Sequence, residues 1–168
     1  MDSSKVRVLF VCLGNICRSP AAEGNFHHLV KERSLEHVFE IDSAGTSAYH
    51  IGEPANSNAR RAAARDGVDL TSRARQFKSR DFDKFDYILA MDHQNYRDIL
   101  AQARKEEDSV KVRLFREFDP SVKSGERTPD VPDPYFGGMD GFEKVQSIMK
   151  RTSAALLDSI LKEQNVSS

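Results

Sequence analysis

Both cysteines of the 168-residue chain lie in one short segment, residues 12–19, which reads CLGNICRS. Cys12 opens this segment, and Arg18 follows it after five intervening residues, directly behind Cys17. A cysteine thiolate is a nucleophile, and the planar guanidinium of an arginine can grip two oxygens of an anion at once. These residue types at this spacing therefore indicate covalent attack on an anionic substrate that is held inside a tight loop.

The residues around Cys12 suit a loop that curls around an anion. Gly14 and Asn15 are of the types that most readily adopt unusual backbone dihedrals. In a turn between a strand and a helix, successive backbone N–H groups point into one concavity, and the helix dipole adds positive potential. That potential favours the thiolate form of Cys12. A small buried strand-end residue is the other interpretation of Cys12, but it leaves the neighbouring glycine, asparagine and arginine unexplained.

Other kinds of site are disfavoured by the residue pattern. His27 and His28 are adjacent on an expected helix and point apart, while His37, His50 and His93 are scattered without metal-ligand spacing. Neither a Walker A nor a GxGxxG pattern occurs, which argues against a nucleotide site. Two cysteines are too few for a disulfide framework. We therefore expect no metal and no cofactor.

The composition of the chain is that of an ordinary globular domain, with 39% hydrophobic residues, 30% charged residues and a net charge of −1. A charge so close to neutral gives no reason to expect nucleic acid or an anionic membrane as a partner. The longest apolar stretches span only a few residues, and the N-terminal MDSSKVRVLF lacks the apolar core of a signal peptide. We expect one cytoplasmic, monomeric domain over residues 1–168, with an ordered core at about 5–162 and a frayed tail at 163–168.

Strand-like and helix-like segments alternate along the chain. We expect strands at residues 6–11, 38–43, 87–91 and 110–115. Helices are expected from Ser19 onward, at residues 58–66, 79–85 and 93–103, and from Asp140 onward. This alternation predicts an α/β fold, a single-domain, three-layer, doubly wound sheet of four parallel strands in the order 2-1-3-4 with helices on both faces. Ligands bind such sheets at the carboxyl ends of the strands, which is where the loop at residues 12–19 lies.

Capping residues mark several of the expected helix ends. Ser19 is the expected N-cap of the first helix, with Pro20 at its first position, and Gly67 closes the helix at residues 58–66. Asp140 and Glu143 form a capping-box-like start of the last helix. The residues at helical spacing that should face inward from this last helix are Phe142, Val145, Ile148, Met149, Leu156 and Ile160.

The C-x5-R-S pattern in the first strand–helix turn resembles that of the low-molecular-weight protein tyrosine phosphatases. Two further segments strengthen the resemblance, namely SAGT at Ser43 to Thr46 and DPY at Asp133 to Tyr135, and it extends from Val6 to about Leu161. The resemblance implies metal-independent hydrolysis of phosphotyrosine in proteins, and of small aryl phosphates, through a cysteinyl-phosphate intermediate. Phosphotyrosine-containing proteins, phosphate and similar oxyanions are the implied partners.

The resemblance assigns a role to each residue of the site. Cys12 is the implied nucleophile, Arg18 and the loop amides hold the phosphate oxygens, and Asp133 protonates the departing phenolate and then activates water. Ser19 is implied to hydrogen-bond the thiolate, and Ser43 to support the strained turn at Asn15. The implied phosphate-binding loop comprises Leu13, Gly14, Asn15, Ile16 and Cys17, and the walls around the substrate ring are Leu13, Ile16, Tyr49 and Tyr135.

The choice of Asp133 as the acid depends on the resemblance. Asp119, Asp130 and Asp140 share its loop, and prolines at positions 132 and 134 restrict the backbone on both sides of Asp133. The residues alone do not separate Asp133 from Asp130. For the two tyrosine walls, packing of a surface aromatic ring on its own loop is the alternative.

The chain departs from the family pattern at two places. Many relatives have two adjacent tyrosines where this chain has Tyr135 and Phe136, and many have a histidine where it reads Ser72-Arg73. The first departure bears on regulation through the second tyrosine, and the second on the bonds behind the loop.

Two other functions are possible for a loop of this kind, and Cys17 needs a role of its own. A thioredoxin-coupled arsenate reductase uses a similar loop but needs cysteines beyond Cys17, and a non-catalytic phosphotyrosine-binding module would not need nucleophile, arginine and acid together. One thiolate suffices for attack, so Cys17 has either a packing role or a redox role. We predict that Cys17 is a redox partner that captures the sulfenic acid formed when peroxide oxidises Cys12.

Overall fold

The central strand of the structure is β1 (Val6–Cys12), a mostly apolar run with three valines that is buried along its whole length. In the computed structural model, which describes residues 5–166, β1 pairs in parallel with β2 (Phe39–Gly45) and with β3 (Tyr87–Ala90). β4 (Val112–Leu114) pairs in parallel with β3 and completes a four-stranded sheet. The order β2-β1-β3-β4 confirms the predicted 2-1-3-4 topology.

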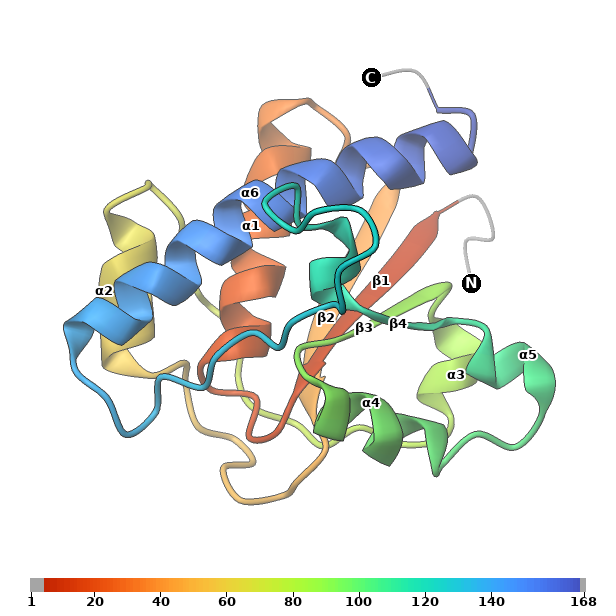
Figure 1. Ribbon diagram of the computed structural model, residues 1–168, viewed down its shortest axis with the longest axis horizontal. Coiled ribbons are helices and arrows are strands. Elements are labelled where there is room, and N and C mark those ends of the chain that lie inside the picture. Colours follow the sequence, from red (N-terminus) through yellow and green to blue (C-terminus); the bar gives the residue numbers. More distant parts are fainter. Residues whose placement is uncertain (1–4, 167–168) are drawn as a thin grey trace.

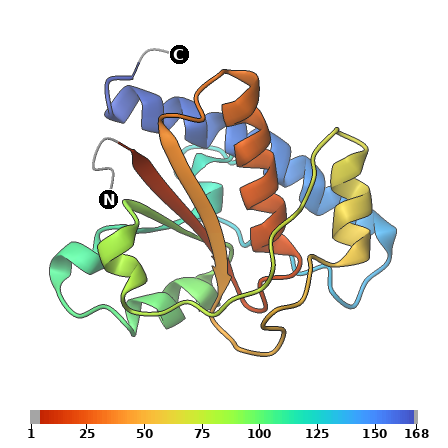
Figure 2. The same cartoon turned by 180° about the vertical axis from the view of Figure 1, so that it is seen from behind.

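Helices cover both faces of this sheet, as predicted (Figure 1). Successive side chains of β1 point to opposite faces, so that Val8 and Phe10 enter one core while Leu9 and Val11 enter the other. Figure 2, which shows the molecule from behind, shows α1 (Arg18–Glu32) lying beside the sheet. The other elements around the sheet are α2 (Ser57–Ala64), α3 (Asp81–Lys84), α4 (His93–Leu100), α5 (Glu106–Ser109), η1 (Phe115–Phe118) and α6 (Met139–Glu163).

The longer helix α6 closes the larger core. It packs on α1, α2 and η1, and the Phe10 ring beneath lies 5.6 Å from that of Phe26 and 5.7 Å from that of Phe115, measured between centroids. Over residues 5–166, no helix, the 25-residue α6 included, combines the length and the apolar character needed to cross a membrane. The six residues predicted to face inward from α6 are all buried: Phe142, Val145, Ile148, Met149, Leu156 and Ile160.

Two predicted helix caps are wrong. α1 begins at Arg18 with Cys17 as its N-cap, so Ser19 lies inside the first turn and its hydroxyl is used by the neighbouring loop instead. α6 begins at Met139 with Gly138 as its N-cap and without a side-chain capping bond, because Glu143 forms an ion pair with Arg65 of α2. The side chains of Ser19 and Glu143 thus bind other residues instead of capping the helices.

The fourth strand is shorter than predicted because a helical turn precedes it. α5 occupies residues 106–109, which the sequence pattern did not indicate, and the strand spans only Val112–Leu114. The buried carboxylate of Asp108 organises this turn by accepting bonds from the backbone N–H and the Nε of Arg104, both at 3.0 Å. The end of the predicted helix at residues 93–103 likewise moves back to Leu100.

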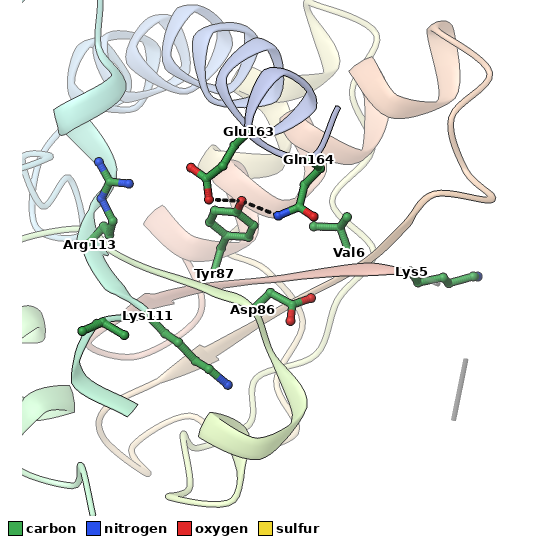
Figure 3. A pocket seen from close by; sticks show the side chains of 9 residues that line it. Lys5, Val6, Asp86, Tyr87, Lys111, Arg113, Glu163 and Gln164 are labelled. Carbon is green, nitrogen blue, oxygen red and sulfur yellow. Dashed lines mark hydrogen bonds between the residues drawn. The ribbon is translucent and has the colours of Figure 1, made fainter. Parts of the chain in front are cut away.

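The segment predicted as a frayed tail begins at the last residue of α6. Glu163 is the last residue of α6, and the Tyr87 hydroxyl donates to its carboxylate at 2.7 Å while the Gln164 amide donates to that hydroxyl at 3.0 Å (Figure 3). Burial is the main cause that raises the pKa of Tyr87 to about 12, so the hydroxyl keeps its proton and remains a donor. These bonds fasten the end of α6 to β3. The last two residues of the predicted tail, 167–168, lie outside the described residues.

Candidate active site

The loops that follow β1 and β2 and the loop that precedes α6 meet at the carboxyl end of the sheet, below the strands in Figure 1. They enclose a pocket of about 200 Å³. Its lining residues are Cys12, Leu13, Gly14, Ile16, Cys17, Arg18, Tyr49, His50, Asp133, Tyr135 and Phe136.

Size alone does not identify this pocket as the reactive one. A larger hollow of about 350 Å³ lies beside the amino ends of β1 and β3, where Lys5, Asp86 and Glu163 bring charges of both signs (Figure 3). The residues that line that hollow include no cysteine, and its Tyr87 hydroxyl is engaged with α6. The smaller pocket contains a nucleophile, a cation and a carboxylate together.

Cys12, the last residue of β1, forms the floor of the pocket and is 2% exposed. Its Sγ lies 3.0 Å from the Ser19 hydroxyl and accepts a hydrogen bond from the backbone N–H of Asn15 at 3.3 Å. With Cys12 as a thiolate, the Ser19 hydroxyl is the donor, so two donors stabilise the negative sulfur. Attack on a substrate above the pocket floor needs this form of the side chain.

Asn15 bends the loop around this sulfur. Its φ is +57°, in the left-handed region that asparagine tolerates better than most residues. Its amide nitrogen donates to Ser19 Oγ at 2.8 Å and to Ser43 Oγ at 2.9 Å, and its amide oxygen accepts from the backbone N–H of Arg75 at 3.0 Å. Gly14, in contrast, has no positive φ; a Cβ there would lie 2.9 Å from the His50 ring.

Glu23 of α1 lies behind Ser43 and extends the same chain of hydrogen bonds. The Ser43 hydroxyl donates to the Glu23 carboxylate at 2.5 Å, and Ser72 also forms a hydrogen bond with it. Burial raises the pKa of Glu23 to about 7, against the two serine hydrogen bonds that lower it. Ser72 therefore contributes a hydroxyl to this chain of hydrogen bonds, while Arg73 donates to the Gly52 carbonyl at 3.0 Å.

Arg18, at the start of α1, is 4% exposed and is held by two hydrogen bonds and an ion pair. Its Nη1 donates to the Asp92 carboxylate at 2.7 Å and to the Val131 carbonyl at 3.2 Å, and its Nη2 lies 3.6 Å from the Asp133 carboxylate. Burial opposes the charge of Arg18, but the negative side chains of Cys12, Asp92 and Asp133 outweigh it and raise its pKa. A permanently charged guanidinium therefore faces the pocket.

The structure separates the two aspartates that the sequence left unresolved. Asp133 lines the pocket, and its carboxylate accepts the backbone N–H of Tyr135 at 3.1 Å. Asp130 points away to α4, where its Oδ1 lies 2.5 Å from the Nδ1 of His93. Of these two side chains, only Asp133 is in reach of a substrate above Cys12.

The four expected wall residues, Leu13, Ile16, Tyr49 and Tyr135, all line the pocket. Tyr49 is 76% exposed at the rim. The ring centroid of Tyr135 lies 5.9 Å from that of His50 and 4.8 Å from that of Phe136. Sequence reasoning missed His50 and Phe136 as lining residues. It also missed Asp92 and Glu23, although Asp92 with Asn95 three residues later is a recognisable helix start, which the structure uses as a capping box.

Cys17 is a second sulfur beside the pocket and differs from Cys12 in its surroundings. It is 5% exposed, and both cysteines are free thiols. Burial, followed by the negative charges of Cys12 and Asp133, raises the pKa of Cys17 to about 12, although Arg18 lowers it. Cys17 therefore keeps its proton near neutral pH and is no competitor of Cys12 as a nucleophile.

Comparisons with known proteins agree with this geometry. A family model described as low molecular weight phosphotyrosine protein phosphatase matches residues 7–166. A low molecular weight protein-tyrosine-phosphatase of Streptomyces coelicolor is 43% identical over 157 residues, or 94% of this chain and 94% of that protein. A crystal structure of a protein tyrosine phosphatase from Entamoeba histolytica, with Hepes in the active site, matches at a TM-score of 0.88 and 38% identity, covering 95% of this chain and 99% of that one. YfkJ from Bacillus subtilis matches at a TM-score of 0.85 and 38% identity, covering 97% and 99% of the two chains.

Proposed function

The chain belongs to the low molecular weight phosphotyrosine protein phosphatase family, and we propose that it hydrolyses phosphotyrosine through Cys12, Arg18 and Asp133. The observation that carries this assignment is the single pocket that these three side chains share. Arg18 and the acid line the same pocket 3.6 Å apart, so a phosphoryl group bound above Cys12 would meet cation, nucleophile and proton donor together.

In the first step, the Cys12 thiolate attacks phosphorus and forms a P–S bond while the P–O bond to the tyrosine breaks. The Arg18 fork and the loop amides hold the phosphoryl oxygens as charge spreads over them. Asp133, protonated at this stage, gives its proton to the departing phenolate, which leaves as tyrosine. The Ser19 hydroxyl, 3.0 Å from the sulfur, stabilises the thiolate before attack.

In the second step, water hydrolyses the cysteinyl-phosphate. The Asp133 carboxylate removes a proton from the water, whose oxygen bonds to phosphorus as the P–S bond breaks. Phosphate leaves, the Cys12 thiolate is regenerated, and Asp133 is again protonated for the next cycle. No step needs an electron donor or a further thiol, which favours hydrolysis over the arsenate reductase chemistry.

The rim of the pocket supports phosphotyrosine as the substrate. Tyr49 and Tyr135 both line the pocket whose floor is Cys12, and their aromatic rings suit contact with a flat phenyl ring that carries a phosphate at its tip. The near-neutral charge of −1 supports phosphoproteins, rather than nucleic acid or membranes, as partners. We place the monomeric enzyme in the cytoplasm, where both thiols stay reduced.

Replacement of the nucleophile tests this function. Cys12→Ser should reduce hydrolysis of para-nitrophenyl phosphate by at least about a thousandfold, because a serine hydroxyl is not ionised here. Calorimetry should still detect phosphate binding to this variant, since Arg18 and the loop amides remain. Vanadate should inhibit the native enzyme competitively, and EDTA should leave it active. Substantial activity of Cys12→Ser, or inactivation by EDTA, would rule out the mechanism.

Replacement of the acid has a more selective effect. Asp133→Asn should lower kcat/KM by about two to four orders of magnitude for phenyl phosphate, whose leaving group needs a proton, and much less for para-nitrophenyl phosphate. Asp140→Asn is the matched control, because Asp140 is an exposed aspartate of α6 outside the pocket lining. An equal loss for both substrates in Asp133→Asn would remove Asp133 from the acid role.

We propose in addition that Cys17 protects the nucleophile from lasting oxidation. Peroxide oxidises the Cys12 thiolate to a sulfenic acid and is itself reduced to hydroxide. The Cys17 sulfur then attacks the sulfenic sulfur, and a disulfide forms with loss of water. Because the Cys12 charge is one cause that raises the pKa of Cys17, oxidation of Cys12 makes Cys17 easier to ionise for this attack.

Peroxide treatment followed by reduction tests this role. Wild type should lose activity, show a Cys12–Cys17 disulfide by mass spectrometry, and recover with dithiothreitol. Cys17→Ser should be active before treatment but recover at least about fivefold less, because its sulfenic acid oxidises further. Equal recovery of the two proteins would leave Cys17 with a packing role only.

A further inference from the structure

Asp130, which faces away from the pocket, is bound at its carboxylate by the first residue of α4. Its Oδ1 accepts the backbone N–H of His93 at 2.9 Å and lies 2.5 Å from the His93 Nδ1. Burial works against ionisation of Asp130, but the hydrogen bonds from His93 lower its pKa overall. An ionised carboxylate can only accept, so Nδ1 is the donor and one oxygen holds both N–H groups.

The backbone of Asp130 is bound as firmly as its side chain. The Arg116 guanidinium donates to the Asp130 carbonyl at 3.0 Å and to the carboxylate of Asp119 at 2.9 Å. Asp119 is 3% exposed and is also bound by Arg151 of α6 at 2.9 Å. Asp130 is therefore fixed between α4 on one side and a buried ion-pair cluster on the other.

Few free torsions separate Asp130 from Asp133. Val131 is tied at both ends, since its N–H donates to the Met91 carbonyl at 2.8 Å and its carbonyl accepts from Arg18 at 3.2 Å. Pro132 and Pro134 then fix φ on either side of Asp133. The segment between Asp130 and the acid thus has little freedom, and the position of Asp130 limits where the Asp133 side chain can lie.

The residue before His93 makes the matching contact on the other catalytic group. Asp92 binds the Arg18 guanidinium at 2.7 Å, and His93 binds Asp130. Two adjacent residues at the start of α4 therefore fix the position of the phosphate-gripping cation and that of the acid loop relative to each other. From this geometry, and on the basis of the proposed function, we propose that His93 and Asp130 are a positioning pair that sets the reach of Asp133 toward the leaving group.

The experiment compares leaving groups in variants of the full chain. His93→Ala and Asp130→Ala should each lower kcat/KM for phenyl phosphate about fivefold to twentyfold, because a misplaced acid transfers its proton poorly. For para-nitrophenyl phosphate the change should stay below about twofold, and the inhibition constant of vanadate should be unchanged, since Arg18 and the loop are intact. His93→Asn, whose amide nitrogen can replace Nδ1, should restore most of the phenyl phosphate activity.

Two controls keep a structural effect apart from a positioning effect. Gln94→Ala alters the next, exposed side chain of α4, which bonds to Asp98, and should change neither substrate. The double variant His93→Ala with Asp130→Ala should be no slower than the slower single variant, because Asp130→Ala already removes the side-chain contact that His93→Ala removes.

The outcomes separate this proposal from the proposed function. If Asp133→Asn is selective for poor leaving groups but the His93 and Asp130 variants match wild type, the positioning pair is wrong and the acid assignment stands. Equal losses for the two substrates in His93→Ala, additive losses in the double variant, or no rescue by His93→Asn would also overturn the pair. If Asp133→Asn itself shows no selectivity, the acid assignment fails and the pair fails with it.

Discussion

The left-handed backbone of Asn15 is the constraint on which the rest of the site depends. At φ +57°, this residue turns the chain back so that its own N–H points at the Cys12 sulfur, 3.3 Å away. The conformation costs roughly 1 kcal/mol for a residue with a Cβ, and three hydrogen bonds of the Asn15 side chain offset that cost. The same bonds place the Ser19 hydroxyl beside the sulfur, so one residue fixes both the shape of the loop and the environment of its nucleophile.

The sheet provides the partners that Asn15 needs. β1 and β2 run in parallel with Phe10 opposite Ser43 and Cys12 opposite Gly45, which brings the Ser43 hydroxyl to the height of the loop. Gly45 leaves no room for a side chain there, since a Cβ would lie 2.7 Å from the Leu13 carbonyl. On the other side, β3 ends at Ala90, and Asp92 is the N-cap of α4, where it can neutralise Arg18. Burial of that guanidinium is tolerable because it is paired and hydrogen-bonded.

Local patterns in the sequence predicted the strand order and the position of the reactive loop, because both follow from the alternation of apolar strands and helices. They failed where a side chain has a choice of partners. Ser19 has the type of an N-cap, yet its hydroxyl bonds to Asn15 and Cys12, and Glu143 pairs with Arg65 instead of closing a capping box. Local patterns also could not distinguish Asp133 from Asp130, because the difference depends on the contact of Asp130 with His93, 37 residues away along the chain.

We infer that the side-chain hydrogen bonds of Asn15, and not only its tolerance of a positive φ, hold the loop in its reactive shape. Measurement of kcat/KM and of vanadate inhibition for Asn15→Gly tests this most directly, because glycine adopts a positive φ freely but cannot make the three bonds. We predict that Asn15→Gly loses about a hundredfold in kcat/KM and binds vanadate more weakly, close to the loss in Asn15→Ala. An Asn15→Gly enzyme within about threefold of wild type, with Asn15→Ala strongly impaired, would contradict this account and show that backbone conformation alone shapes the site.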